Sequence, residues 1–308
     1  MHAHLVRSKV LLRAAMGIRS ASTVGGALDE AVVRMPHKEA LRSIKQDVRY
    51  SFKELNAAVN ELANGFLDLQ FESGNVVALW LPNSIENVIT QLAAARAGLT
   101  VAIIEPEVSQ AEELAFILQD SNASGLVFEP KQGGRNQTEI VQGLFPELAT
   151  FRQRKEVFRP KNFRHLHSII TTSWDPVEGM LNLNGMMINS PEPYVMKAVS
   201  KLLSKQTPLA VTYSKVDGHM PKKSEVLSHG DLLTHAEMLA KSLDLHATDK
   251  ILLTGEKAGL TVGPLAAIAR SAQIVLPSTE YDQDAVQQAL KLENCSIVGS
   301  GLKHFARV

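Results

Sequence analysis

Short apolar runs that alternate with longer amphipathic stretches constrain the fold of this chain most strongly. Between residues 75 and 130 the runs NVVALWL, TVAIIEP and SGLVFEP are continuously apolar, which is typical of strands covered on both faces. The stretches between them carry apolar residues three or four positions apart, as on one face of a helix. This alternation predicts an α/β fold with layered, mainly parallel sheets.

Local signals predict where several helices begin or end. A hydroxyl residue with an acid three positions later forms a capping box, and a glycine after the last turn adopts the left-handed cap conformation. On these grounds we expect helices to begin after Ser51 (with Glu54), Ser84, Ser109 (with Glu112) and Ser228 (with Asp231), and one to end at Gly98.

The middle of the chain differs in composition from its flanks. Residues 131–163 are polar and basic, which favours an exposed excursion with a solvated surface, or a contact with a phosphate or an acidic partner. From residue 208 the apolar runs LAVTYS, KILLTG, AQIVLP and CSIVGSG predict further strands. We therefore expect two subdomains, with their boundary at roughly residues 131–205.

Charge and composition exclude several classes of protein. The chain has 308 residues with 32 basic and 32 acidic side chains, so it lacks the cationic surplus that nucleic-acid binding requires. Its single cysteine, Cys295, excludes an intramolecular disulfide and a multi-cysteine metal site. No run approaches the ~18 consecutive apolar residues of a transmembrane helix.

The first residues have the composition of an organellar presequence. Four basic residues and no acid precede Asp29, and leucine, valine and isoleucine are interleaved with them. Such acid-free, basic and amphipathic starts are typical of mitochondrial targeting; the alternative is a frayed basic tail. We expect residues 1–22 to be a presequence and the protein to lie in the mitochondrial matrix or on the matrix side of the inner membrane.

The block from residue 50 to 130 resembles the N-terminal region of the acyl-activating, AMP-forming synthetase superfamily, which includes the acyl-CoA synthetases. The resemblance rests on Tyr50, Leu55, Ala63, Gly74, LPNSIE at 81–86, AAARAG at 93–98, Pro106 and Glu113-Leu114. It implies that residues 23–308 form a truncated AMP-binding domain, with the sheets of that family's N-terminal part and an incomplete C-terminal edge.

The resemblance also implies a phosphate-binding loop after the run LAVTYS. In that family a loop rich in glycine, serine and threonine wraps the ATP phosphates and a Pro-Lys pair follows, because backbone N–H groups must approach the phosphates closely. Here the loop is degenerate, with one glycine and an acid where phosphates would lie. Its candidate positions are Tyr213, Ser214, Lys215, Asp217, Gly218, Lys222 and Lys223.

Other landmarks of the family have no counterpart in this sequence. No aromatic-Gly-x-Thr-Glu segment, which the resemblance implies for adenine and magnesium, follows residues 297–301. Where the family has an aromatic-His pair, the sequence reads GEKAGLTVG. We therefore expect no catalytic residue, no metal site and no bound cofactor.

Three functions follow as hypotheses. The first is a catalytically inactive acyl-CoA synthetase-like protein that acts as a structural or regulatory subunit among other mitochondrial proteins. The second is a residual module that binds a nucleotide or acyl-CoA without turnover. The third is an AMP-forming acyl-CoA ligase completed by another chain, which alone would use ATP and Mg²⁺, with Lys222 or Lys223 as the phosphate-binding cation.

Overall fold

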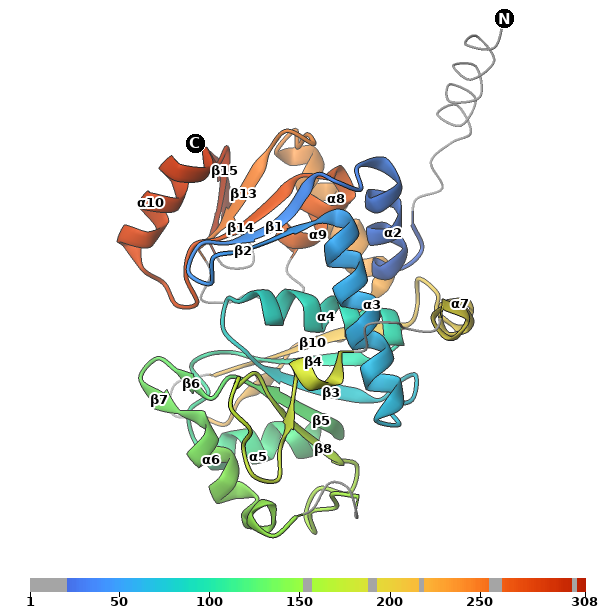
Figure 1. Cartoon of the computed structure of the whole chain (residues 1–308), viewed down its shortest axis with the longest axis vertical. Helices are drawn as coiled ribbons and strands as arrows, with labels where there is room; N and C mark the ends of the chain where they lie inside the picture. The colour runs from blue at the N-terminus through green and yellow to red at the C-terminus, as the bar shows by residue number, and fades with distance from the viewer. Residues whose placement is uncertain (1–20, 152–156, 188–192, 216–218, 255–261, 301–303) are drawn as a thin grey trace, which may run out of the picture.

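Two mainly parallel sheets organise the molecule (Figure 1). The computed structural model describes residues 21–151, 157–187, 193–215, 219–254, 262–300 and 304–308. The parallel sheets confirm the fold class predicted from the alternating runs.

The first sheet combines strands from the two ends of the described chain. Its order is β16 (His304–Arg307), β15 (Ile297–Ser300), β13 (Lys250–Leu253), β14 (Gln273–Leu276), β1 (Glu39–Ser43) and β2 (Val48–Ser51). The edge strands β16 and β2 are antiparallel to their neighbours, and the inner pairs are parallel.

The second sheet is built from the middle of the chain. Its order is β11 (Lys222–Lys223), β10 (Pro208–Ser214), β4 (Thr100–Ile104), β3 (Val76–Trp80), β5 (Ala123–Phe128), β8 (Ser168–Thr171) and β9 (Leu181–Asn182), and β12 (Leu227–Ser228) also pairs with β10. Strand β5 precedes the expected boundary region, β8 lies within it and β10 follows it, yet all three belong to this sheet. The boundary itself stays a prediction.

Helices fill the space between the sheets and cover their outer faces (Figure 1). Between the sheets lie α2 (Val24–Arg34), α3 (Phe52–Asp68), α4 (Ile85–Ala97), α8 (His229–Ser242) and α9 (Val262–Arg270). The outer face of the second sheet carries α5 (Ala111–Asp120) and α6 (Gln137–Leu144), and the outer face of the first carries α10 (Gln283–Glu293). The remaining elements are α7 (Pro193–Leu202), the hairpin β6 (Lys131–Gln132) and β7 (Arg135–Asn136), and the 3-10 turns η1 (Pro146–Ala149) and η2 (Asn184–Met186).

The side-chain alternation of the strands explains this layering. In β3, Val77 and Leu79 pack in the core between the sheets, whereas Ala78 and Trp80 face the outer core with α5 and α6. Because successive strand residues point to opposite faces, an uninterrupted apolar run supplies both cores. None of the described helices is long and apolar enough to cross a membrane.

Most of the predicted helix ends are confirmed. Ser51 and Ser228 form capping boxes, Ser84 caps α4, and Gly98 ends α4 with a φ of 78°. The box predicted for Ser109 and Glu112 is wrong by one position, because α5 is capped by Gln110 together with Glu113.

The expectation of an exposed excursion at 131–163 is wrong in part. Gln132 and Gln137 are buried, and Phe145, Phe158 and Phe163 pack into the outer core against the second sheet. The three rings meet edge to face, with Phe145 at 5.9 Å from Phe158 and 5.0 Å from Phe163 between centroids. Most residues of the segment are polar, so these buried aromatic rings were not evident from the sequence. Among its described basic side chains, Lys131, Arg159 and Lys161 are exposed and Arg135 is half-buried.

Candidate phosphate-loop site

The candidate site is the hairpin that β10 and β11 form at the edge of the second sheet. Tyr213 lies opposite Lys223, and Ser214 lies opposite Lys222. The hairpin is closed further by Ser224, whose backbone N–H donates to the Thr212 carbonyl at 2.8 Å and whose hydroxyl accepts from the Thr212 N–H at 2.9 Å. The predicted positions Asp217 and Gly218 lie outside the described residues, so their role stays a prediction.

Tyr213 is fully buried, and its hydroxyl donates to a carboxylate on the neighbouring helix α5. The acceptor is Oδ2 of Asp120, at 2.6 Å. The same oxygen lies 3.1 Å from Nζ of Lys223, which also lies 5.8 Å from the centroid of the Tyr213 ring. Burial, together with the hydrogen bond to Asp120, raises the pKa of Tyr213 well above its usual range. The hydrogen bond from Tyr213, aided by Lys223, lowers the pKa of Asp120.

Lys215 binds a second carboxylate of the same helix. Its Nζ lies 2.7 Å from Oε1 of Glu113, a side chain that is only 10% exposed. The other carboxylate oxygen of Glu113 accepts the backbone N–H groups of Ser109 and Gln110 at 2.9 and 3.1 Å. Burial raises the pKa of Glu113, but these hydrogen bonds outweigh it, so that the pKa lies below its usual value. Glu113 is therefore ionised at neutral pH and pairs with the Lys215 ammonium.

Lys222 differs from the other two lysines. It is exposed on β11, and no ion pair within the described part of the chain engages it. An anionic ligand at this hairpin would therefore meet the solvated ammonium group of Lys222. Because an ion pair with an exposed lysine contributes little energy, this group alone would bind the ligand weakly. To use Lys215 or Lys223 as well, the ligand would have to displace a carboxylate.

Glu113 and Asp120 are the partners that sequence reasoning missed as members of this site. They lie seven positions apart on α5, two turns along the same helix face, and each faces one cation of the hairpin. In the sequence these two acids are visible only as a pair spaced i, i+7. That spacing does not identify the lysines as their partners, because the lysines come close to α5 only when β10 pairs with β4. Across the described ranges, no three histidine, cysteine or acidic side chains gather as metal ligands.

Comparison with known proteins assigns the chain to a family. The model of the family described as AMP-binding enzyme matches residues 28–181, half of the chain. The mitochondrial medium-chain acyl-CoA ligase ACSF2 of Macaca fascicularis is 28% identical over 228 residues, which is 73% of this chain and 36% of the relative. The ACSF2 protein of Rattus norvegicus is 24% identical over 292 residues, 90% of this chain and 46% of the relative. This chain thus spans less than half the length of these relatives.

Solved structures agree with this fold. The N-terminal domain of FACL13 from Mycobacterium tuberculosis superposes with a TM-score of 0.69 at 18% identity, over 90% of this chain and 62% of that one. MbtA of Mycobacterium smegmatis gives a TM-score of 0.73 at 19% identity, over 93% of this chain and 49% of that one. The resemblance predicted from residues 50–130 is confirmed, as a match to part of those longer chains.

Proposed function

The chain belongs to the AMP-binding enzyme family, and from this membership we propose that it is a catalytically inactive acyl-CoA synthetase-like protein. In this proposal it acts as a structural or regulatory subunit of a mitochondrial assembly, in the matrix or on the matrix side of the inner membrane. The mitochondrial location is supported by the names of its relatives and by the basic first residues.

The proposed loss of catalytic activity is supported by the ion pairs at the hairpin. Two of the three lysines at the hairpin, Lys215 and Lys223, are held by Glu113 and Asp120. Stabilising a transferring phosphoryl group needs cations that are preorganised toward it. Carboxylates fixed on a helix neutralise those cations and repel phosphate oxygens.

The direct test is ATP–pyrophosphate exchange by the purified chain with Mg²⁺ and a medium-chain fatty acid. We expect no exchange above the protein-free rate, with a functional medium-chain ligase as the positive control. Exchange by the purified chain alone would overturn the proposal.

A paired variant tests whether the carboxylates are the cause. Glu113→Gln with Asp120→Asn removes both charges and keeps the side-chain shapes. By calorimetric titration we expect at least a tenfold gain in Mg-ATP affinity over the wild type. The pair Glu61→Gln with Asp68→Asn on α3, where Glu61 is half-buried and Asp68 exposed, is the matched control. Equal affinities in all three proteins would exclude this cause.

The native size of the endogenous protein tests the subunit role. In gently solubilised mitochondria we expect a band far above 33.6 kDa with defined co-migrating proteins. A band at monomer size would contradict a role as a subunit.

A second candidate is a medium-chain acyl-CoA ligase completed by another chain, with ATP and Mg²⁺ as cofactors. It is favoured by the names of the relatives and by Lys222, which faces solvent at the hairpin. In this case exchange appears only when mitochondrial fractions are added, and Lys222→Ala with Lys223→Ala abolishes it. Activity unchanged by that double substitution would remove these lysines from the mechanism.

A further inference from the structure

Helix α7 lies at the periphery of the molecule, against α3 and α4 (Figure 1). Among the described residues of α7, only Met196 is buried. The segment 193–207 contains three lysines and no acid, although the whole chain has equal numbers of basic and acidic residues. Positive charge is therefore concentrated on this segment.

The exposed side of α7 carries an apolar stripe beside a lysine. Tyr194, Ala198 and Leu202 are spaced by four residues, so they follow one another along one face of the helix. The side chains of Tyr194 and Leu202 are 69% and 73% exposed. Lys201 borders this stripe in the helical register, and Lys205 follows just after the helix. Tyr194, Ala198 and Leu202 are called the exposed stripe below, and Lys201 and Lys205 are the lysines beside it.

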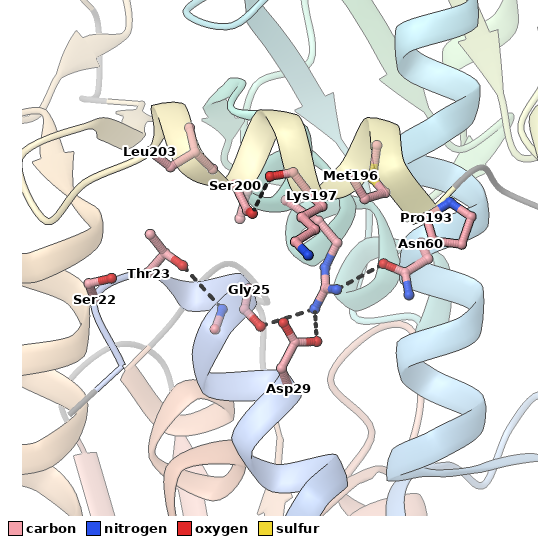
Figure 2. A pocket seen from close by; sticks show the side chains of 13 residues that line it. Ser22, Thr23, Gly25, Asp29, Asn60, Pro193, Met196, Lys197, Ser200 and Leu203 are labelled. Carbon is pink, nitrogen blue, oxygen red and sulfur yellow. Dashed lines mark hydrogen bonds and ion pairs between the residues drawn. The ribbon is translucent and has the colours of Figure 1, made fainter. Parts of the chain in front are cut away.

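A pocket of about 530 Å³ lies beneath α7 and brings another lysine to the same region. Figure 2 shows Lys197 and Ser200 of α7 facing Thr23 and Gly25 at the start of α2. The acid of this pocket, Asp29, is already paired with Arg96 at 2.9 Å. Within the described residues no ion pair engages Lys197, Lys201 or Lys205, so their charges are available to an anion outside the chain.

We propose that α7 docks the protein onto a bilayer surface containing anionic phospholipid. Exposed tyrosine and leucine side chains next to lysines match such a surface, because the apolar groups enter the interface while the ammonium groups approach lipid phosphates. Each lysine near an anionic membrane contributes about 1 kcal/mol to binding, which corresponds to a roughly fivefold higher binding constant. An acidic protein surface would attract the lysines but gives no separate reason for the exposed stripe.

Vesicle flotation with the full chain tests this proposal. The probes are vesicles of phosphatidylcholine alone and of equimolar phosphatidylcholine and phosphatidylglycerol. We expect binding to the anionic vesicles only, weakened by added salt. We expect Lys201→Glu with Lys205→Glu, and separately Tyr194→Ser with Leu202→Ser, each to reduce binding at least tenfold.

Helix α10 supplies a matched control. Lys291→Glu and Leu292→Ser change an exposed lysine and a leucine that is 62% exposed, on the outer face of the first sheet. We expect this variant to bind anionic vesicles within twofold of the wild type. Absence of wild-type binding, equal binding by the α7 variants, or capture by an acidic protein in place of vesicles would each overturn the proposal.

Discussion

At the scale of the single residue, His229 shows how a buried polar group sets pH dependence. Its ring is fully buried, and Nδ1 accepts the backbone N–H of Val24 at 3.1 Å. Burial lowers the pKa of His229 to about 4. The neutral ring links the first residue of α2 to the first residue of α8, and a proton on Nδ1 would remove this acceptor.

We expect the free energy of unfolding to fall as pH falls from about 6.5 toward 4. An unfolded histidine has a pKa of about 6.5, so in this window the unfolded state binds more protons than the folded state. The contribution is intact above pH 6.5, and its full loss amounts to about 3 kcal/mol. Urea unfolding at a series of pH values measures it.

His229→Gln is the control for this pH dependence, because its carbonyl can accept the same N–H without titrating. The difference between the wild-type and variant curves of unfolding free energy against pH gives the contribution of His229 alone. Carboxylates that titrate in the same pH range contribute equally to both curves. Parallel curves from pH 7 to 4 would show that His229 makes no contribution.

At the scale of the element, the sequence predicted what is encoded locally. The capping boxes at Ser51 and Ser228 and the left-handed end at Gly98 need only a few neighbouring residues, and they were found. The apolar runs likewise predicted the strands that structure both sheets.

Features that depend on distant neighbours were not predicted. The pairing of Lys215 with Glu113 and of Lys223 with Asp120 arises only because β10 lies beside β4, close to α5. The burial of Phe145, Phe158 and Phe163 depends on the outer face of the second sheet. In both cases the residue types were visible in the sequence, whereas the surface that receives them was not.

The edge strand β16 is fastened by one arginine. Arg307 donates to both carboxylate oxygens of Asp249, at 3.0 and 3.1 Å, and to the carbonyls of Leu243 and Asp244 at 2.9 and 2.6 Å. Burial raises the pKa of Asp249, but the bonds from Arg307, His246 N–H and other donors outweigh it, so the carboxylate is ionised.

We expect Arg307→Ala to release β16 from the sheet. Hydrogen bonds to charged groups contribute about 1.5–3 kcal/mol, so amide exchange along β15 and β16 should accelerate by roughly 10- to 100-fold. Hydrogen exchange with mass spectrometry measures this, with β3 to β5 as internal reference. Arg307→Lys keeps the charge and should give an intermediate effect; unchanged exchange in Arg307→Ala would contradict the role of this contact.

At the scale of the whole molecule, Asn83 joins the two sheets. It follows β3 of the second sheet and is 3% exposed. Its Nδ2 donates to the carbonyl of Leu253, at the end of β13, at 3.0 Å and to that of Ser278 at 3.2 Å. Its backbone N–H donates to the Thr279 carbonyl at 3.2 Å.

We expect Asn83→Ala to lower the global free energy of unfolding by about 1–3 kcal/mol, because buried carbonyls lose their donor. Denaturant unfolding measures the change, and exposed Asn162→Ala should stay within about 0.5 kcal/mol of the wild type. A variant at Asn83 as stable as the wild type would show that the side-chain hydrogen bonds of Asn83 make no net contribution to stability.

The pairing of β1 with β14 has a consequence for synthesis on the ribosome. Leu41 lies opposite Ile274, so β1 is synthesised early but can pair with β14 only after most of the chain has been made. Such distant pairing slows folding and prolongs the exposure of unpaired edges. The hairpin of β1 and β2 therefore leaves the exit tunnel long before its sheet can form, so the edge of β1 that pairs with β14 stays open while the rest of the chain is synthesised.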